Sequence, residues 1–295
     1  MTGSIPAKQT VVPDAATDDV DLLDVFRTLW RGRWLIIAVT FGFVLAGIAY
    51  AFLATPVYRS EVVLIPNESE RPSNLAASLG GLASLAGINL GSSVDKMEGI
   101  ATLRSRVLIE DFIRDEDLLP VLFADDWDAE KKRWKDSDEE DWPTVLTGVD
   151  YFIDEVRTVD ENSTTGLVTL GVEWTDPVLA EKWTSELVQR VNDRLRQQTL
   201  SNSRQRLSYL NSELSKANLI ELRQAISNLI EGEIQTITLA QADSEYAFKV
   251  VDPPRVPIEP VWPKKILIAA AAVFLGFVFG VLAVLLRAAG RYRVQ

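Results

Sequence analysis

Two long uncharged apolar stretches lie near the ends of this chain, at Trp34–Leu53 and Ile266–Leu286. Each is about 20 residues long, and a helix of that length, rising about 1.5 Å per residue, spans the roughly 30 Å hydrocarbon core of a bilayer. Residues 54–265, between them, carry short apolar repeats separated by charged segments. The pattern predicts two transmembrane helices, 34–53 and 266–286, that flank a folded domain.

The first apolar stretch follows several arginines, as the core of a signal peptide would. Such a core is only about 7–15 residues long and ends at a small-residue cleavage site. This stretch is longer, and it leads through Ala54 and Pro56 into a predicted strand. We therefore expect a retained membrane anchor.

Arginines flank both apolar stretches on the sides that face the chain ends: Arg27, Arg31, Arg33, Arg287, Arg291 and Arg293. Short cytoplasmic segments of membrane proteins are enriched in Arg and Lys, and Lys264 and Lys265 only weaken the contrast. We expect residues 1–33 and 287–295 to be cytoplasmic and the middle domain to lie outside.

Two further segments have weaker patterns. Residues 1–17 show no apolar period, which predicts disorder, whereas Asp18–Trp30 has helical spacing and predicts a short amphipathic helix at the membrane surface. Leu75–Gly91 is apolar but broken by glycines. It predicts a small helix packed on the core or, alternatively, a loop that contacts another subunit or faces the lumen of an assembly.

Alternation of apolar and polar residues predicts three strands in the middle domain, at Tyr58–Ile65, Val168–Trp174 and Tyr246–Val250. The first and last of these adjoin the membrane spans, so we expect them in one sheet. Asp95–Leu119 has apolar residues at helical spacing and predicts a helix.

A longer helix is predicted to begin at Pro177, after the N-cap residue Asp176, and to run to Ser215, about 58 Å at 1.5 Å per residue. Its apolar residues continue from Trp183 to Leu214, further than one small base can cover, which predicts a homo-oligomer. Asn218 and Glu221 have the spacing of a capping box and predict a second helix that ends near Ala242. It runs back beside the first helix or continues after a bend. Together they would form a helical arm over residues 177–243.

Prolines recur at every third position between Asp252 and the second span: Pro254, Pro257, Pro260 and Pro263. A polyproline II helix has three residues per turn, so the four rings would follow one edge of a stiff rod about 30 Å long. The segment 252–263 is either a rigid spacer or a docking edge for a membrane partner.

Small residues recur every fourth position in both spans, at Ala272, Gly276 and Gly280 and also at Ala38, Gly42 and Ala46. Small residues at this spacing let helices approach closely in lipid. They are candidate packing or partner sites. Neither span contains a charged residue, which argues against an ion path.

The composition excludes several classes of chemistry. The sequence contains no Cys and no His, so disulfides, cysteine nucleophiles and Ser-His-Asp triads are impossible. With 42 acidic against 30 basic residues and a net charge of −12, nucleic-acid binding is not expected. We expect no cofactor, no metal and no catalytic residues.

A charged run at Asp125–Pro143 contains Trp127, Trp134 and Trp142. It lacks the D-x-D-x-D-G spacing of a calcium loop, so a solvated face is expected. The tryptophans either anchor the segment to the core or stack on sugar rings.

These features together resemble the chain-length determinant (Wzz) family, the polysaccharide co-polymerases. The residues that carry the resemblance are Glu221–Pro254, with the pattern LIE…LA…EYAFKV.DP, the proline-rich approach to the second span, the GGLASLAGI segment and the strand after the first span. The arm is short for the family. The Gly-x-x-x-x-Gly-Lys-Ser/Thr motif of the members with a fused kinase does not occur.

The resemblance implies an α+β inner-membrane protein, with an α/β base near the lipid and extended helices in the periplasm. It implies a bell-shaped ring of identical subunits, an octamer, that acts with a Wzy-type polymerase. The ring would set the modal length of a lipid-linked polysaccharide such as O-antigen, without catalysis. A co-polymerase for exopolysaccharide or capsule export, working with a separate kinase or outer-membrane channel, is the alternative. A periplasmic sensor is more distant, because residues 287–295 leave no room for an output module.

Overall fold

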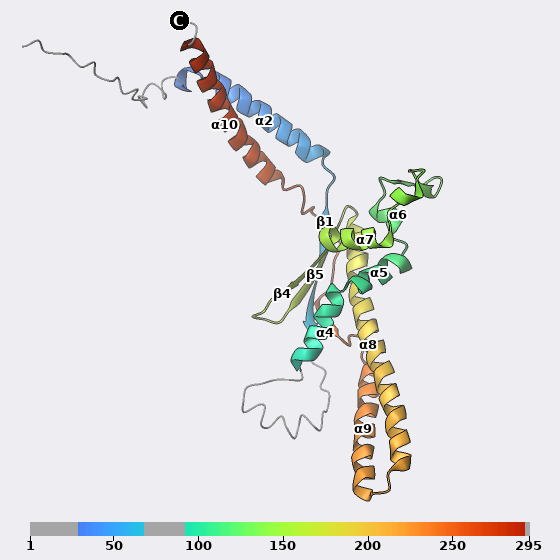
Figure 1. Cartoon of the computed structure of the whole chain (residues 1–295). Helices are drawn as coiled ribbons and strands as arrows, with labels where there is room; N and C mark the ends of the chain where they lie inside the picture. The colour runs from blue at the N-terminus through green and yellow to red at the C-terminus, as the bar shows by residue number, and fades with distance from the viewer. Residues whose placement is uncertain (1–28, 68–91, 293–295) are drawn as a thin grey trace, which may run out of the picture. The chain divides into compact units, whose positions relative to one another are not determined.

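The computed structural model describes residues 29–67 and 92–292 and divides the chain into two compact units. One unit holds the helices from the two ends of the chain, and the other comprises Thr55–Trp262 (Figure 1). The predictions for residues 1–17, for most of Asp18–Trp30 and for Leu75–Gly91 lie outside the described residues.

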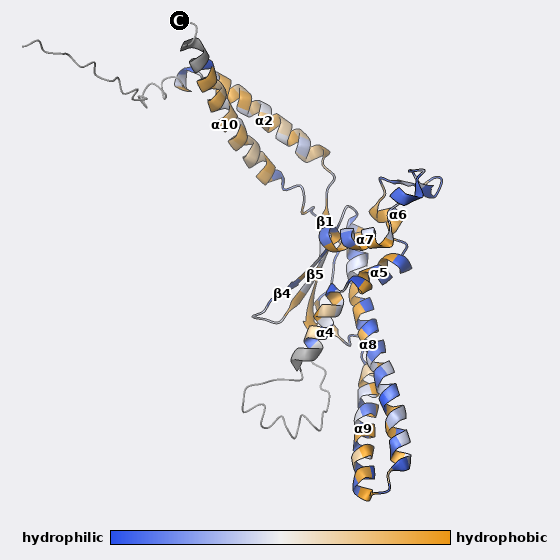
Figure 2. Ribbon diagram, in the orientation of Figure 1, coloured by the Kyte–Doolittle hydropathy of each residue, from blue (hydrophilic) through white to orange (hydrophobic). Residues whose placement is uncertain are grey.

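The membrane unit is an antiparallel pair of apolar helices, α2 at Arg33–Leu53 and α10 at Lys265–Tyr292. Both are long and apolar enough to cross a bilayer. Figure 2 shows apolar residues around both helices, as expected where lipid and not water surrounds the surface.

The other unit is built on a four-stranded antiparallel sheet with the order β4-β5-β1-β6. The strands are β1 at Tyr58–Pro66, β4 at Arg157–Glu161, β5 at Val168–Trp174 and β6 at Phe248–Asp252. Strand β1 pairs with β5 from Tyr58↔Trp174 to Leu64↔Val168 and with β6 on its other side. The predicted pairing of the first and last strands is confirmed. Strand β4 was not predicted.

Short helices precede and follow a charged excursion in the middle of this unit. They are α4 at Ser92–Arg104, α5 at Arg106–Asp115, α6 at Leu119–Leu122 and α7 at Val145–Tyr151, followed by a π-helical turn at Phe152–Val156. The single helix predicted at Asp95–Leu119 is wrong. Ser105 interrupts it with extended backbone, and its side chain caps α5 by accepting from the Leu108 N–H at 3.2 Å.

The core lies where the first half of α8, at Pro177–Lys216, packs on β1 and β5. Trp183 is buried at its centre, with ring centroids 5.2 Å from Trp174, 5.9 Å from Phe152 and 6.5 Å from Phe112. Asp176 caps the helix by accepting from the Val178 N–H at 2.8 Å. The predicted start and length of this helix are confirmed.

Beyond the core, the second half of α8 pairs with α9 at Ile220–Ala242 to form a two-helix arm (Figure 1). The chain turns back, so the hairpin alternative is confirmed. The predicted capping box is wrong: Leu219 is the N-cap residue, and no side chain caps this end. The mixed α and β fold class, with long helices and two apolar terminal helices, is confirmed.

Asn192 of α8 joins the helix to the start of β6. Its buried amide oxygen accepts from the N–H groups of Ala247 and Phe248, both at 2.8 Å, and its amide nitrogen donates to the Phe248 carbonyl at 3.0 Å. One side chain therefore pairs three backbone groups of an edge strand, and it fixes the point at which the chain leaves the arm for the sheet.

Candidate functional site

The small residues predicted in the second span form its contact face with the first span. A Cβ atom added to Gly276 would lie 2.7 Å from Thr40 Cα, and one added to Gly280 would lie 3.0 Å from Ile36 Cα. Ala272 is buried, and its Cβ lies 2.9 Å from the place of a Cβ on Gly47. The two backbones thus approach as closely as glycine allows, and this face of α10 is occupied by the chain's own helix.

The small residues of the first span are placed differently. A Cβ on Gly42 would meet no atom within 4 Å, and Ala38 and Ala46 are exposed. Helix α2 instead meets α10 through the row that includes Gly32, Ile36 and Thr40. The small-residue stripe of α2 therefore faces away from α10.

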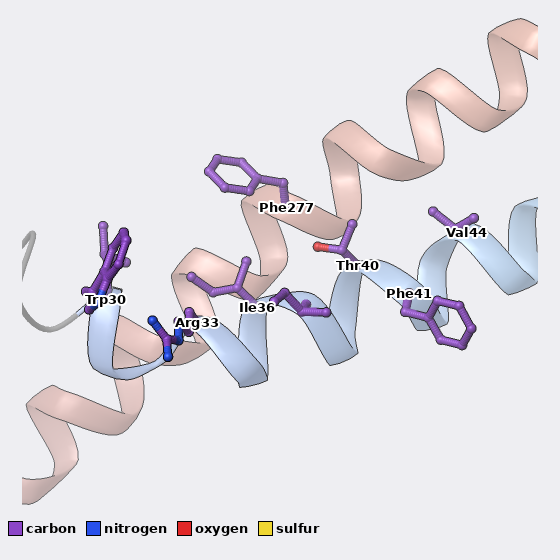
Figure 3. A pocket seen from close by; sticks show the side chains of 9 residues that line it. Trp30, Arg33, Ile36, Thr40, Phe41, Val44 and Phe277 are labelled. Atoms are coloured by element: carbon purple, nitrogen blue, oxygen red, sulfur yellow. The ribbon is translucent and has the colours of Figure 1, made fainter.

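Beside this contact, a groove of about 560 Å³ follows the first half of α2 (Figure 3). Its lining consists of bulky apolar side chains with an arginine at one end: Leu29, Trp30, Arg33, Ile36, Ile37, Thr40, Phe41, Val44 and, from α10, Phe277. The groove was not predicted, because its walls are brought together by two segments more than 200 residues apart.

Arg33 lines one end of the groove, and two further arginines, Arg31 and Arg287, lie toward the same end of the two helices. Gly32 packs against Val284, so the end of α10 that carries Arg287 lies beside Arg31 and Arg33. The guanidinium of Arg33 lies over the Trp30 ring, 5.4 Å from its centroid. Within residues 29–67 and 92–292, no carboxylate pairs with these three arginines.

The proline-rich segment runs back beside β1. Ser60 Oγ donates to the Arg255 carbonyl at 3.1 Å, and Val57 and Trp262 form an isolated antiparallel bridge, with the Val57 N–H 3.0 Å from the Trp262 carbonyl. Bends at Ile258, Glu259 and Val261 interrupt the segment, so a straight rod through all four prolines does not form. Pro254, Pro257 and Pro260 are half-buried, and Pro263 is buried.

The arm has two apolar seams on α9. The first seam faces α8 and includes the buried Ile226 and Ala240. Beside it, Glu233 accepts a hydrogen bond from Arg206 at 2.6 Å. The second seam has heptad spacing and is not covered by α8. This second seam consists of Leu222, Ala225, Leu229, Gly232, Thr236 and Leu239.

The three leucines of the second seam are 48–56% exposed, and a Cβ on Gly232 would meet no atom within 4 Å. The apolar stripe of α8, in contrast, is buried in the base from Trp183 to Leu195 and half-buried on the arm. The prediction that α8 leaves uncovered apolar surface is therefore wrong. The uncovered heptad seam lies on α9.

In the charged run, two short strands, β2 at Trp127–Asp128 and β3 at Arg133–Trp134, form a small hairpin. Its two tryptophans pack edge to face, with centroids 4.9 Å apart. The Lys131 backbone N–H donates to the Asp128 carboxylate at 3.1 Å, and this hydrogen bond lowers the pKa of Asp128. A 3-10 turn follows at Glu139–Asp141.

A shallow cavity of about 460 Å³ lies beside this hairpin, with Trp134 and Trp142 among its walls. Across the described part of the chain, no group of three carboxylates is arranged to hold a metal ion. The observed contacts of the three tryptophans lie within the charged run itself: Trp127 packs on Trp134, and Trp142 Nε1 donates to the Asp136 carbonyl at 3.1 Å.

Two family models match this chain, each over a different segment. The model of the Wzz family, "Chain length determinant protein", matches residues 18–116, and the GNVR model, "G-rich domain on putative tyrosine kinase", matches residues 221–289. The first match includes α2 and β1, and the second runs from α9 through most of α10. The chain therefore contains a chain-length determinant segment of the Wzz type, which includes the first apolar helix, and a GNVR segment, which includes the second.

Sequence relatives are similar over limited segments. "Putative tyrosine-protein kinase EpsB" of Ralstonia solanacearum is 30% identical over 109 residues, which are 37% of this chain and 14% of that protein. "Ferric enterobactin transport protein FepE" of Escherichia coli K12 is 27% identical over 103 residues, 34% of this chain and 26% of that protein. The chain thus spans a seventh to a quarter of the curated relatives it matches.

Two solved structures are similar at low identity. A "full-length bacterial polysaccharide co-polymerase" covers 92% of this chain and 99% of its own length, with 15% identity and a TM-score of 0.44. A fragment of the co-polymerase WzzB from Salmonella Typhimurium covers 70% of this chain and all of its own length, with 14% identity and a TM-score of 0.35.

Proposed function

We propose that this chain sets the modal length of a lipid-linked polysaccharide, such as O-antigen, made by a separate Wzy-type polymerase. The observation that carries the proposal is the joint match of the chain-length determinant and GNVR models to a chain with two membrane helices and a projecting arm. The polymerase would carry the chemistry, and this chain would act by contact.

The deciding experiment is a gel of polysaccharide from cells with and without the gene. We expect deletion to leave polymer synthesis intact and to replace the modal cluster of lengths by a broad distribution. Loss of all polymer, or an unchanged ladder, would contradict the proposal.

We further propose that the chain works as a closed ring of identical copies, an octamer by family resemblance. The second seam of α9 supports self-assembly, because apolar residues at heptad spacing suit another helix as partner. Two membrane spans hold every copy in the same orientation, so equivalent arms would stand side by side. Repeating one head-to-tail contact around an axis closes a ring.

The proposed topology places residues 1–33 and 287–295 in the cytoplasm and 54–265 in the periplasm. The arginines outside both spans support it. Because the chain has no cysteine, single cysteines report position cleanly. We expect Ser137→Cys to react with a membrane-impermeant thiol reagent in intact cells, and Ser4→Cys and Gln295→Cys to be protected. Labelling of either terminal variant would contradict this topology.

A second candidate function is co-polymerisation of an exported exopolysaccharide or capsule with a separate kinase. The similarity to EpsB and the GNVR match favour it. The two candidates differ in product: deletion would change exopolysaccharide in the medium in one case and the lipid-linked ladder in the other. A role as a periplasmic sensor receives no support from the comparisons.

A further inference from the structure

The groove beside α2 has an apolar wall, a cationic end and an unpaired hydroxyl group, and we propose that it binds one anionic phospholipid. The phosphate would lie at Arg31, Arg33 and Arg287, and an acyl chain would follow Ile37, Phe41 and Val44. The site goes beyond regulation of polymer length, because it concerns how the chain is seated in the bilayer.

The shape of the groove favours a flexible chain over a protein helix. Its walls are bulky side chains, with Ile37 55%, Phe41 61% and Phe277 55% exposed. Helices approach closely in lipid through small residues. In this chain Gly276 and Gly280 already contact α2. The small-residue stripe of α2, which includes Gly42, lies on a face of that helix away from α10. A volume of about 560 Å³ is within the range, roughly 300–1,000 Å³, of ordinary ligand sites.

The charge at one end selects the lipid. Arginines without a carboxylate partner, next to a tryptophan, are typical of the membrane–water boundary. The cytoplasmic leaflet carries anionic lipids, and each arginine near its surface contributes about 1 kcal/mol of attraction. The Arg33 guanidinium lies over the face of the Trp30 ring, which leaves its N–H donors available for a phosphate.

The hydroxyl of Thr40 supplies an independent observation. Thr184, Thr236 and Thr238 each donate to the carbonyl four residues earlier in their helices, at 2.7, 3.0 and 2.8 Å. The Oγ1 atom of Thr40 is buried and has no hydrogen-bond partner among the residues that the structure describes, and Thr40 is one of the residues that line the groove (Figure 3).

In hydrocarbon, an unpaired hydroxyl is unfavourable because no water can bond to it. Thr40 is seven residues beyond Arg33, about 10 Å further along the helix. A phospholipid whose phosphate lies on the arginines places its ester oxygens at the next depth, where they could accept a hydrogen bond from Thr40.

The first test measures lipid affinity by native mass spectrometry of the whole protein in mild detergent. The probes are dioleoyl phosphatidylglycerol and dioleoyl phosphatidylcholine. We expect one tightly held phosphatidylglycerol per chain and roughly thirty-fold weaker binding in Arg31→Gln/Arg33→Gln, since two arginines at about 1 kcal/mol each correspond to that factor. The matched control, Lys264→Gln/Lys265→Gln, removes two charges at the other end of α10 and should bind normally. Equal retention of both lipids, or equal loss in both variants, would overturn the proposal.

The second test blocks the groove. Val44→Phe fills it and should abolish tight binding, whereas Leu45→Phe, one residue away on an exposed face, should not. If these two variants bound phosphatidylglycerol equally well, the lipid would not be bound in this groove.

If a polyprenyl diphosphate displaced phosphatidylglycerol at equal concentration, the ligand would be the lipid carrier and not a phospholipid, which would overturn the proposal. If Ile37→Cys formed a disulfide between two copies of the chain in native membranes, a second copy would occupy the groove. That result would also overturn the proposal.

Discussion

Gly276 of α10 lies against the backbone of Thr40 of α2 so closely that a Cβ atom on Gly276 would be 2.7 Å from Thr40 Cα. Backbone cannot move aside as the end of a flexible side chain can. One turn further along, Gly280 makes the equivalent approach to Ile36. The small residues of the second span therefore join the two spans of one chain.

The first prediction concerns this contact. Gly276→Leu/Gly280→Leu should separate α2 from α10 and lower the free energy of unfolding by about 1–3 kcal/mol, the usual cost of overpacking. Unfolding by titration with a denaturing detergent measures it. Gly42→Leu is the matched control, because a Cβ there meets open space. If the control and the double variant unfolded alike, Gly276 and Gly280 would not form the contact between α2 and α10.

The second prediction concerns the link between α8 and β6. Asn192→Leu removes the partners of the buried N–H and carbonyl of Phe248 and of the half-buried N–H of Ala247. Each such group costs about 1–3 kcal/mol, so we expect stability to fall by about 3 kcal/mol or more. Urea unfolding followed by tryptophan fluorescence measures the change. Asn211→Leu, an exposed position on the same helix, should have almost no effect.

The third prediction concerns Arg190, which joins α8 to the end of α5. Its guanidinium donates to Asp115 at 2.5 Å and Glu116 at 2.8 Å and lies over the Phe112 ring. Burial acts to lower the pKa of Arg190, but the hydrogen bonds to the two carboxylates outweigh burial and raise it above its ordinary value.

A base with a raised folded-state pKa keeps its stabilising contribution at all pH values below its unfolded pKa and loses it only as the pH rises through the folded pKa. Arg190→Met should therefore cost about 1 kcal/mol, with the same difference from wild type between about pH 6 and 9. Arg223→Met, at an arginine without a described ion pair, is the control. A cost that vanished within this pH window would refute the assignment.

The elements predicted correctly are those whose signal is local. Period-two alternation was sufficient for β1 and β5, and Asp176 followed by Pro177 located the start of α8. The interruption at Ser105 escaped prediction because apolar spacing continues across it, while a single extended residue changes the helix direction.

The surface features depend on neighbours that are distant in sequence. The heptad pattern of α8 was visible, but which of its positions α9 and the sheet would cover was not. The groove could not be predicted because it depends on how α2 aligns with α10. The unpaired hydroxyl of Thr40 could not be predicted either, because a threonine in a helix usually donates to its own backbone. The small-residue spacing found the contact face of α10 but not that of α2.

In the function proposed above, the chain regulates polymer length through an assembled arm while a separate polymerase carries out polymerisation. Leu222→Arg/Leu229→Arg places charge in the exposed seam of α9 without removing buried contacts. Gln224→Arg/Gln235→Arg adds the same charge at exposed positions outside that seam. The most direct measurement compares the polysaccharide ladders of deletion cells that express each variant at wild-type level. We expect full polymer yield with a lost or shortened modal length for the seam variant, and a normal ladder for the control. Abolished polymer, or a seam-variant ladder identical to that of wild type, would contradict it.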